Sequence, residues 1–277
     1  MPELPEVETI SRALDTLVQG RTIVRAKLVR PRLAPDTTPP KFASALGNAR
    51  INFVHRRGKH ILIDFHNRKT LIVHLRMSGR FSLLEPEDEN PKYTHAIFHL
   101  DNDRRLVFDD QRHFGLMKIV RTADLVEANE LKKLAPEPFS DDFSLDYLIS
   151  VAKKTRRSLK EFLLDQTKVT GLGNIYASEA MFAAGLRPTK RANTLTRTSA
   201  SRLYDSIRTV LEEAISYSDK IKIDPRNIEG SYFSANDNSG WFVYDREREP
   251  CRNCKTPIVR LKQGGRSTYF CRRCQRN

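Results

Sequence analysis

The first eight residues, Met-Pro-Glu-Leu-Pro-Glu-Val-Glu, place an amine and several carboxylates in one short segment. If processing removes Met1, the chain begins at Pro2, whose ring nitrogen becomes a free secondary amine. An α-amine has a pKa of about 7.7–8.0, so a usable fraction is uncharged at neutral pH and can attack a sugar carbon to form an iminium. Glu3 and Glu6 would then be candidate proton-transfer groups. The alternative is an acidic helix start with proline in its first turn, and the segment taken alone fits that alternative better.

Four cysteines in the last part of the chain form the strongest local motif. Their spacing is C-x2-C-x16-C-x2-C, which is typical of a zinc site with four thiolate ligands and leaves room for a β-hairpin between the two pairs. A catalytic zinc is disfavoured because four thiolates leave no open coordination position, and a redox dithiol fits less well than structural zinc. The ligands would be Cys251, Cys254, Cys271 and Cys274.

A glycine-rich turn, Gly171-Leu172-Gly173-Asn174, separates two helical patterns. It is no dinucleotide fingerprint, because Tyr176 stands where the third glycine should be. We expect a tight turn that exposes backbone N–H groups, with Asn174 capping the next helix. With Lys160 and Arg156 upstream, such a turn could hold a nucleic-acid phosphate without reading sequence. A plain connection between two helices is equally compatible with the pattern.

Several candidates lie in the N-terminal half. Lys59 follows Arg56-Arg57-Gly58, and Met77 stands between two arginines in Arg76-Met77-Ser78-Gly79-Arg80. Arg112 and Phe114 lie on either side of His113, and Gly115 follows Phe114. An apolar or aromatic wedge with arginines nearby can fill the gap that a displaced base leaves in a duplex. Each residue also has an ordinary explanation, because surface lysines are mostly solvated and Met is a common core filler.

Charge and composition restrict the partner and the compartment. In 277 residues, 48 Lys and Arg exceed 34 Asp and Glu, giving a net charge of +14 and a pI near 9.8. This excess indicates a polyanionic partner, nucleic acid before membrane. We find neither a long apolar run nor a signal peptide, and we therefore expect a cytoplasmic, nucleoid-associated protein whose cysteines are not paired in disulfides.

The elements that must position these residues change in type along the chain. Apolar spacing predicts a helix over 5–19, then a β-rich region over 22–121 without intervening helices, which suggests a sandwich or flattened barrel. A proline-rich linker near 136–142 leads to further helices. The predicted strands are 22–29, 51–54, 60–65, 71–75, 96–100, 106–108 and 116–120, and the later helices are 144–153, 158–165, 174–184 and 196–217.

Together these motifs resemble the bacterial formamidopyrimidine-DNA glycosylases, of the wider family that includes endonuclease VIII. The resemblance covers nearly the whole chain and rests on the N-terminal segment, on 56–59 and 74–79, on Leu-Leu-Asp-Gln at 163–166, on 171–179 and on the cysteine motif. It implies an α+β multidomain fold: an N-terminal β-sandwich with a leading helix (1–135), a helix–two-turns–helix domain with a lesion-capping loop (136–240) and a C-terminal zinc-finger β-hairpin with four cysteine ligands (241–277).

The resemblance also implies roles for the candidate residues. Pro2 would be the nucleophile, Glu3 the acid/base residue and Glu6 a supporting carboxylate. Lys59 would assist β-elimination and Arg266 δ-elimination. The implied DNA-binding residues are Met77, Tyr93, Arg112, Phe114, Arg156, Lys160 and Asn174. The implied activity is excision of oxidised purines from double-stranded DNA, followed by nicking of the abasic strand, by a monomer that holds one zinc ion.

Some residues depart from the family pattern. Tyr93 replaces a frequent histidine, Gln111 and His113 flank Arg112 in place of proline and arginine, and 221–240 lacks the usual capping-loop run. The preferred lesion therefore stays open, with an endonuclease VIII-like preference for oxidised pyrimidines or hydantoins as one alternative. A non-catalytic, DNA-binding zinc-ribbon protein is an alternative from a different class.

Overall fold

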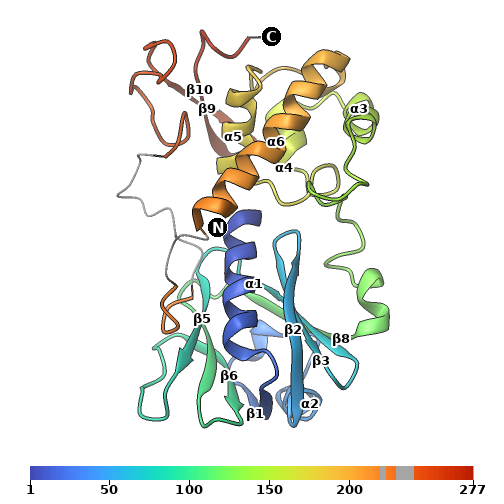
Figure 1. Cartoon of the computed structure of the whole chain (residues 1–277), viewed down its shortest axis with the longest axis vertical. Coiled ribbons are helices and arrows are strands. Elements are labelled where there is room, and N and C mark those ends of the chain that lie inside the picture. Colours follow the sequence, from blue (N-terminus) through green and yellow to red (C-terminus); the bar gives the residue numbers. More distant parts are fainter. Residues whose placement is uncertain (219–222, 229–239, 277) are drawn as a thin grey trace. The chain divides into compact units, whose positions relative to one another are not determined.

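The computed structural model describes residues 1–218, 223–228 and 240–276, which form two compact units. Most of the predicted capping loop at 221–240 lies outside the described residues. The first unit comprises Met1–Lys132 and Tyr217–Tyr232, and the second comprises Lys133–Ser216 and Phe233–Asn277. Figure 1 shows the elements of both units in sequence colours.

The first unit is built on an antiparallel sheet whose strands are connected in the order β5-β7-β6-β1-β2-β3-β4-β8. The predicted strands are all present, most with longer bounds. Together with β5, which was not predicted, the strands of the sheet are β1 (Thr22–Leu28), β2 (Ala49–Arg57), β3 (His60–Phe65), β4 (Lys69–His74), β5 (Gly79–Leu84), β6 (Thr94–Leu100), β7 (Arg105–Asp110) and β8 (Leu116–Arg121).

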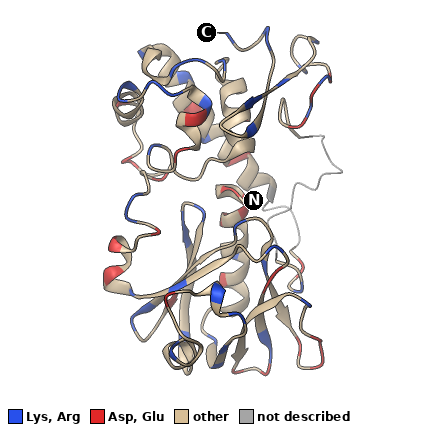
Figure 2. Ribbon diagram, turned by 180° about the vertical axis from the view of Figure 1, so that it is seen from behind, with Lys and Arg blue, Asp and Glu red and all other residues tan. Residues whose placement is uncertain are grey.

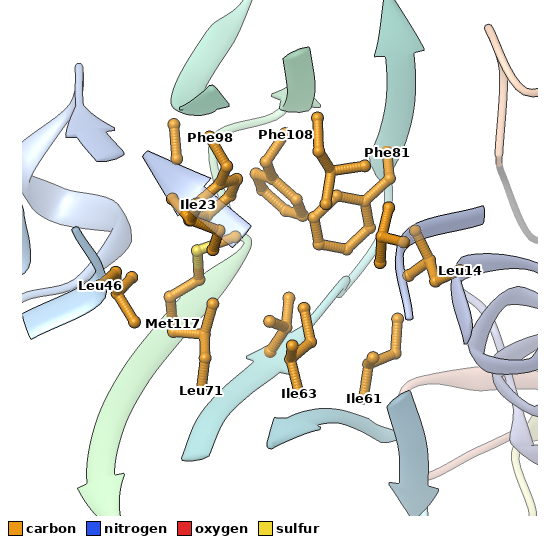
Figure 3. Packing of buried hydrophobic residues seen from close by; sticks show 14 of the residues in the cluster. Leu14, Ile23, Leu46, Ile61, Ile63, Leu71, Phe81, Phe98, Phe108 and Met117 are labelled. Atoms are coloured by element: carbon orange, nitrogen blue, oxygen red, sulfur yellow. The ribbon is translucent and has the colours of Figure 1, made fainter. Parts of the chain in front are cut away.

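The sheet folds over on itself, so that its two halves enclose one hydrophobic core. Ile61, Ile63 and Leu71 of one half face Phe81 and Phe108 of the other (Figure 3), and all are buried. This packing gives the predicted β-sandwich, because each strand presents alternate side chains to the enclosed side.

Helix α1 (Leu4–Val18) packs against β2 and β3 and begins at the residues of chemical interest. Its apolar positions, among them Val7, Ile10 and Leu14, are buried at helical spacing. Pro5 suits the first turn, and Gly20, at φ 77°, follows the C-terminal end, where a left-handed residue is common. The sequence therefore fixes where this helix starts.

Two elements of the first unit differ from the sequence-based expectation. Helix α2 (Pro39–Leu46) interrupts the region predicted to lack helices, and buries Phe42 and Leu46 on one side. Pro39 and Pro40 occupy the first helical positions, where proline is favourable, so they begin a helix and do not mark a loop. Strand β5 was not predicted, because its sequence Gly-Arg-Phe-Ser-Leu-Leu has no sustained alternation of apolar and polar residues, and Phe81–Leu84 are all buried.

The second unit contains the later helices of the chain and the cysteine hairpin. Its elements are α3 (Leu145–Lys153), α4 (Leu159–Leu164), α5 (Asn174–Ala183), α6 (Arg197–Ser218), β9 (Val259–Gln263) and β10 (Arg266–Phe270). The helices fall where the sequence predicts them. Short 3₁₀ turns lie at Pro31–Leu33 and Thr122–Glu127 in the first unit and at Ala192–Thr194 in the second.

The two turns between α4 and α5 are held by one side chain. The amide of Gln166 donates to the carbonyls of Leu164 and Leu172, while its oxygen accepts the N–H of Gly171 at 2.9 Å. Gly171 has φ 88°, a conformation that favours glycine. Gln166 thus provides hydrogen bonds to three backbone groups of this tight double turn.

None of the described helices combines the length and the apolar composition needed to cross a lipid bilayer.

Candidate catalytic and DNA-binding site

The N-terminal segment presents Pro2 on a rigid support. Met1 is exposed and Pro2 half-buried, whereas the side chains of Glu3 and Glu6 are buried. Glu3 and Glu6 form a reciprocal capping box: the Glu3 N–H donates to Oε2 of Glu6 at 2.7 Å, and the Glu3 carboxylate accepts the N–H of Glu6. The segment is therefore a capped helix start, and its two buried carboxylates lie close to Pro2 in the sequence.

Lys59 lies in the two-residue turn that joins β2 to β3. Gly58 has φ 59° and Lys59 has no positive φ, as in a type II′ turn. Lys59 is buried, and Arg56 two residues before Gly58 donates to Glu8 of α1 at 2.5 Å. The turn is therefore anchored to the helix that carries Pro2.

A pocket of about 420 Å³ adjoins the N-terminus within the first unit. Met1 contributes to its wall together with residues from three loops. The full described lining is Met1, Arg32, Arg76, Met77, His113, Phe114, Gly115 and Leu116. Among these described residues there are two arginines and no carboxylate, so the pocket suits an anionic ligand. Sequence reasoning missed Arg32, although Pro31-Arg32-Leu33 marks a short turn that exposes a cation.

Met77 and Phe114 are large apolar side chains that stay exposed, at 44% and 48%. Arg112 is also exposed, and its guanidinium lies 5.3 Å from the centre of the Phe114 ring. Single exposed apolar side chains are common, but apolar groups gathered at one place on the surface can mark a contact site. The structure thus brings Met77 and Phe114 to the wall of the same pocket, with Arg112 beside them.

A histidine cluster supports the segment that carries Arg112 and Phe114. Nδ1 of His113 lies 2.8 Å from an Arg30 nitrogen and 2.9 Å from Nε2 of His95, and the two imidazoles are stacked. Because arginine can only donate, His113 accepts at Nδ1. Burial lowers the pKa of His95. Tyr93 packs edge-on against His113, so it belongs to this support as well as being a candidate DNA contact.

A second pair of imidazoles lies near Lys59. The rings of His60 and His74 meet edge to face at 4.7 Å, and Nδ1 of His74 accepts the N–H of Arg76. Burial lowers the pKa of His60 to about 4 and that of His74 to about 2. Both rings are therefore neutral at physiological pH, and the charged neighbours of the pair are Lys59, Arg57 and Arg76 together with the carboxylate of Glu130.

The four cysteines of the second unit are arranged for one metal ion. Their sulfurs lie within 4.8 Å of one another, with 3.8 Å between Cys251 and Cys274 and 3.4 Å between Cys254 and Cys271. A tetrahedral zinc–thiolate site with bonds of about 2.3 Å has sulfurs about 3.8 Å apart, so the residues fit zinc. Burial raises the pKa of the Cys271 and Cys274 thiols, and a bound cation would keep them deprotonated.

The sequence led us to expect that Asn174 caps α5. In the structure Asn174 is instead the first residue of the helix. Gly173 occupies the cap position, because the Asn174 amide reaches away from the helix and donates to the carbonyl of Ser267 in the finger hairpin at 2.9 Å. Lys160 is fully buried, and its ammonium donates to the Asn174 carbonyl at 2.8 Å and to the Ser178 hydroxyl at 2.7 Å. The α5 start and the hairpin are thus linked through Asn174.

Arg156 and Arg266 are both exposed in the second unit. Arg266 begins β10, directly after the hairpin turn Gly264-Gly265, whose two glycines have positive φ. Figure 2 shows lysines and arginines distributed over both units, so the charge excess is not confined to the finger.

Family comparisons agree along the whole chain. The model described as "Formamidopyrimidine-DNA glycosylase N-terminal domain" matches residues 1–117, that of the corresponding H2TH domain matches 134–224, and "Zinc finger found in FPG and IleRS" matches 248–277. A Ruegeria pomeroyi protein named formamidopyrimidine-DNA glycosylase is 40% identical over 288 residues and covers 100% of both chains. The chain belongs to the formamidopyrimidine-DNA glycosylase family.

Solved structures of family members agree with this assignment. Lactococcus lactis Fpg (MutM) in complex with DNA that contains N7-benzyl-Fapy-dG is 32% identical, with a TM-score of 0.90 and 100% of each chain covered. The same values hold for its complex with DNA that contains an oxidised pyrimidine. The α+β fold with an N-terminal β-sandwich, an H2TH domain and a zinc-finger hairpin is therefore confirmed, and the four cysteines form the zinc site of this family.

Proposed function

We propose that this chain is a bifunctional DNA glycosylase and abasic-site lyase of base-excision repair that removes oxidised purines from double-stranded DNA. The observation that carries the assignment is the position of Pro2. It precedes a helix whose capping box buries Glu3 and Glu6, and Met1 lines the pocket that also holds Met77 and Phe114. An amine, carboxylates and a wedge are the groups that such a reaction needs.

Pro2 is the proposed nucleophile. With Met1 removed, the lone pair of its nitrogen attacks C1′ of the damaged nucleotide, and the electrons of the C1′–base bond leave with the base, which takes up a proton. Glu3 is the proposed donor of a proton to the ring oxygen as the sugar opens, and the nitrogen and C1′ then form an iminium. Glu6 supports Glu3 through the bond to its N–H. The iminium acidifies C2′, so that β-elimination expels the 3′ phosphate, assisted by Lys59. Arg266 assists the second elimination.

The remaining residues are proposed to hold the distorted duplex. Met77 and Phe114 fill the gap left by the extruded nucleotide, and Arg112 contacts the orphaned base. Arg156, Tyr93 and Asn174 are proposed to contact the DNA backbone. The Asn174 amide donates one hydrogen to Ser267 and has a second available for a phosphate. Lys160 is buried against Asn174 and Ser178, so we propose that it acts by positioning Asn174.

The preferred lesion is the open part of the proposal. Fpg of Lactococcus lactis has been solved with both a substituted Fapy-dG and an oxidised pyrimidine in its DNA, which keeps oxidised pyrimidines as a second substrate class. We favour oxidised purines because all three family models carry the formamidopyrimidine-glycosylase description or include that family. We propose domain limits at 135/136 and 240/241, action as a monomer and a location with the nucleoid DNA.

Borohydride trapping on a duplex with one abasic site tests the nucleophile. Protein whose N-terminal residue is shown to be Pro2 should form a covalent adduct, because borohydride reduces the iminium to a stable amine. Protein that retains Met1 should form none, because an acylated proline nitrogen has no lone pair for the attack. Absence of an adduct with the Pro2 form would overturn the assignment and favour a non-catalytic DNA-binding protein.

A nicking panel separates the two lesion classes. Duplexes that contain 8-oxoguanine, formamidopyrimidine or dihydrouracil should be cleaved with the two purine lesions well ahead of the pyrimidine. Glu3→Gln provides a matched control, since it should lose base excision while still forming the adduct at a preformed abasic site. Faster cleavage of dihydrouracil would assign an endonuclease VIII-like preference.

A further inference from the structure

Asp110, the last residue of β7, lies fully buried between the two loops that carry the proposed wedge. One loop, residues 75–78, joins β4 to β5 and carries Met77. The other, residues 111–115, joins β7 to β8 and carries Arg112 and Phe114. We call these the Met77 loop and the Phe114 loop. The proposed reaction assigns Asp110 no role.

The Asp110 carboxylate forms hydrogen bonds with both loops. Oδ1 accepts the Ser78 hydroxyl of the Met77 loop at 2.5 Å and the Arg112 N–H at 3.2 Å, and Oδ2 accepts the Gly115 N–H at 2.7 Å. The Ser78 hydroxyl oxygen also accepts the Arg112 N–H at 3.1 Å. One carboxylate and one hydroxyl therefore join the residue after Met77 to both ends of the segment that holds Phe114.

The same two loops share a foundation in the core. A Cβ on Gly79, directly after the Met77 loop, would lie 2.7 Å from the Phe108 ring, and a Cβ on Gly115 would lie 2.8 Å from that ring. Phe108 is buried beside Phe81 (Figure 3). Both glycines are thus closely packed on one aromatic ring, while Asp110, two residues further along β7, holds the loops by hydrogen bonds.

We propose that Asp110 is a positioning residue that joins Met77, Arg112 and Phe114 into one rigid wedge, so that all three enter the duplex in a fixed relation. The inference rests on the proposed function of these three residues. Its physical basis is that a probe must already hold its geometry when the base leaves the stack, and ordering two separate loops at that moment would oppose binding.

The protonation state of Asp110 agrees with this role. Burial alone would raise the pKa of the carboxyl, but the hydrogen bonds from Ser78, Gly115, Arg112 and Phe114 outweigh burial and lower it. The carboxylate is therefore ionised at neutral pH and can accept from every donor that surrounds it.

Two variants and one control test the proposal. Asp110→Asn replaces one carboxylate oxygen, which accepts hydrogen bonds, with an NH2 group, which only donates. Either the Gly115 N–H or the Ser78 hydroxyl and the Arg112 N–H then lose their acceptor on residue 110. Ser78→Ala removes only the link from the Met77 loop and is the milder change. Asp64→Asn is the matched control, because Asp64 is also a buried aspartate of the same sheet but accepts from Thr70 and from His55, away from both loops.

Three measurements are made on the full chain after removal of Met1, so that Pro2 is the N-terminal residue. The first is single-turnover excision from an 8-oxoguanine:cytosine duplex. The second is the fluorescence of 2-aminopurine placed beside the lesion, which rises when the base stack opens. The third is strand cleavage at an abasic site in single-stranded DNA, where there is no stack to open and no opposite base to contact.

We expect Asp110→Asn to lower duplex excision by about 10- to 100-fold, the range for a displaced positioning group, and to abolish most of the fluorescence rise. Single-strand cleavage should stay at the wild-type rate, Ser78→Ala should show a smaller loss of the same kind, and Asp64→Asn should match wild type in all three measurements. Equal fluorescence in wild type and both loop variants would overturn the inference, as would equal losses in Asp64→Asn. Absence of excision from the duplex by the wild type would instead overturn the proposed function.

Discussion

The N–H of Glu3 donates to Oε2 of Glu6 at 2.7 Å, and the carboxylate of Glu3 accepts the N–H of Glu6 in return. The first of these bonds fixes the peptide that joins Pro2 to Glu3. The orientation of the terminal residue is therefore set by the helix that follows it, and the proposed acid/base group is held by the same pair of bonds. Catalytic position and helix stability depend on one structural feature.

Two substitutions of Glu6 distinguish its role in capping α1 from the effect of its negative charge. Glu6→Ala removes the acceptor of the Glu3 N–H and should lower the free energy of unfolding by about 1 kcal/mol, the usual value of a helix cap. It should also lower single-turnover excision by about tenfold or more, because Glu3 loses its fixed position. Glu6→Gln keeps an oxygen for the same bond and should retain most of both properties. If the two variants behave alike, the charge of Glu6 matters and the bond does not.

Lys160 should support DNA binding without contacting a phosphate. Lys160→Met removes the donor to the Asn174 carbonyl and the Ser178 hydroxyl, which keep their own bond to each other at 2.8 Å, and should lower the free energy of unfolding by about 1 kcal/mol. The slope of log Kd against log salt concentration should stay at the wild-type value. The exposed Arg156 is the comparison, since Arg156→Met should reduce that slope by about 0.9 if it neutralises one phosphate. A similar reduction in Lys160→Met would show that its ammonium reaches DNA.

Removing zinc should disorder the finger hairpin and weaken DNA binding. The wild type should contain one zinc ion per chain by elemental analysis, and chelation or Cys254→Ala should release it. Duplex affinity should fall by about tenfold or more, because folding of such a hairpin depends on the metal. Adding zinc back should restore the affinity of the chelated wild type but not of Cys254→Ala. Unchanged affinity in zinc-free protein would show that the finger is dispensable for binding.

His60 should make the protein less stable as the pH falls below neutrality. Its folded-state pKa is about 4, below the ordinary value of 6.5, so between these values the unfolded chain binds the proton more readily. The stability contributed by the neutral ring is complete above pH 6.5 and decreases as the pH falls towards 4, by on the order of 3 kcal/mol in total. Urea unfolding of wild type and His60→Leu at several pH values measures this slope. The variant should lose less stability over the window and keep the part of the slope that comes from His74, whose pKa is also lowered, whereas equal slopes would contradict the assignment.

The sequence predicted the site best where function is carried by contiguous residues. The N-terminal segment, the cysteine spacing and the Gly171-Leu172-Gly173 turn can each be recognised locally, and every helix except α2 and every strand of the sheet except β5 followed from apolar spacing. The zinc site in particular needs only residue types and intervals, because four thiolates at that spacing have few other uses.

What the sequence could not supply are relationships between distant segments. Lys160 resembles a surface lysine until α5 is seen to bury it, and Asn174 resembles a cap until Ser267 of the hairpin takes up its amide. Asp110 lies 32 residues from Ser78 along the chain, and only the pairing of β5 with β7 brings them together. Such contacts depend on strand register, which the apolar pattern of each strand does not determine.

Glu179 of α5 anchors the segment that leads into the zinc hairpin, so the position of the hairpin depends on this helix. Its carboxylate accepts the N–H groups of Phe242, Val243 and Tyr244, and Phe182 of the same helix packs with Cys251 and Cys271. The segment that matches the zinc-finger model begins only at residue 248, after these contacts. A chimera that exchanged 248–277 with a relative would therefore transplant the metal ligands without their anchor. An exchange that keeps this anchor has to begin before Phe242 and retain a glutamate at position 179.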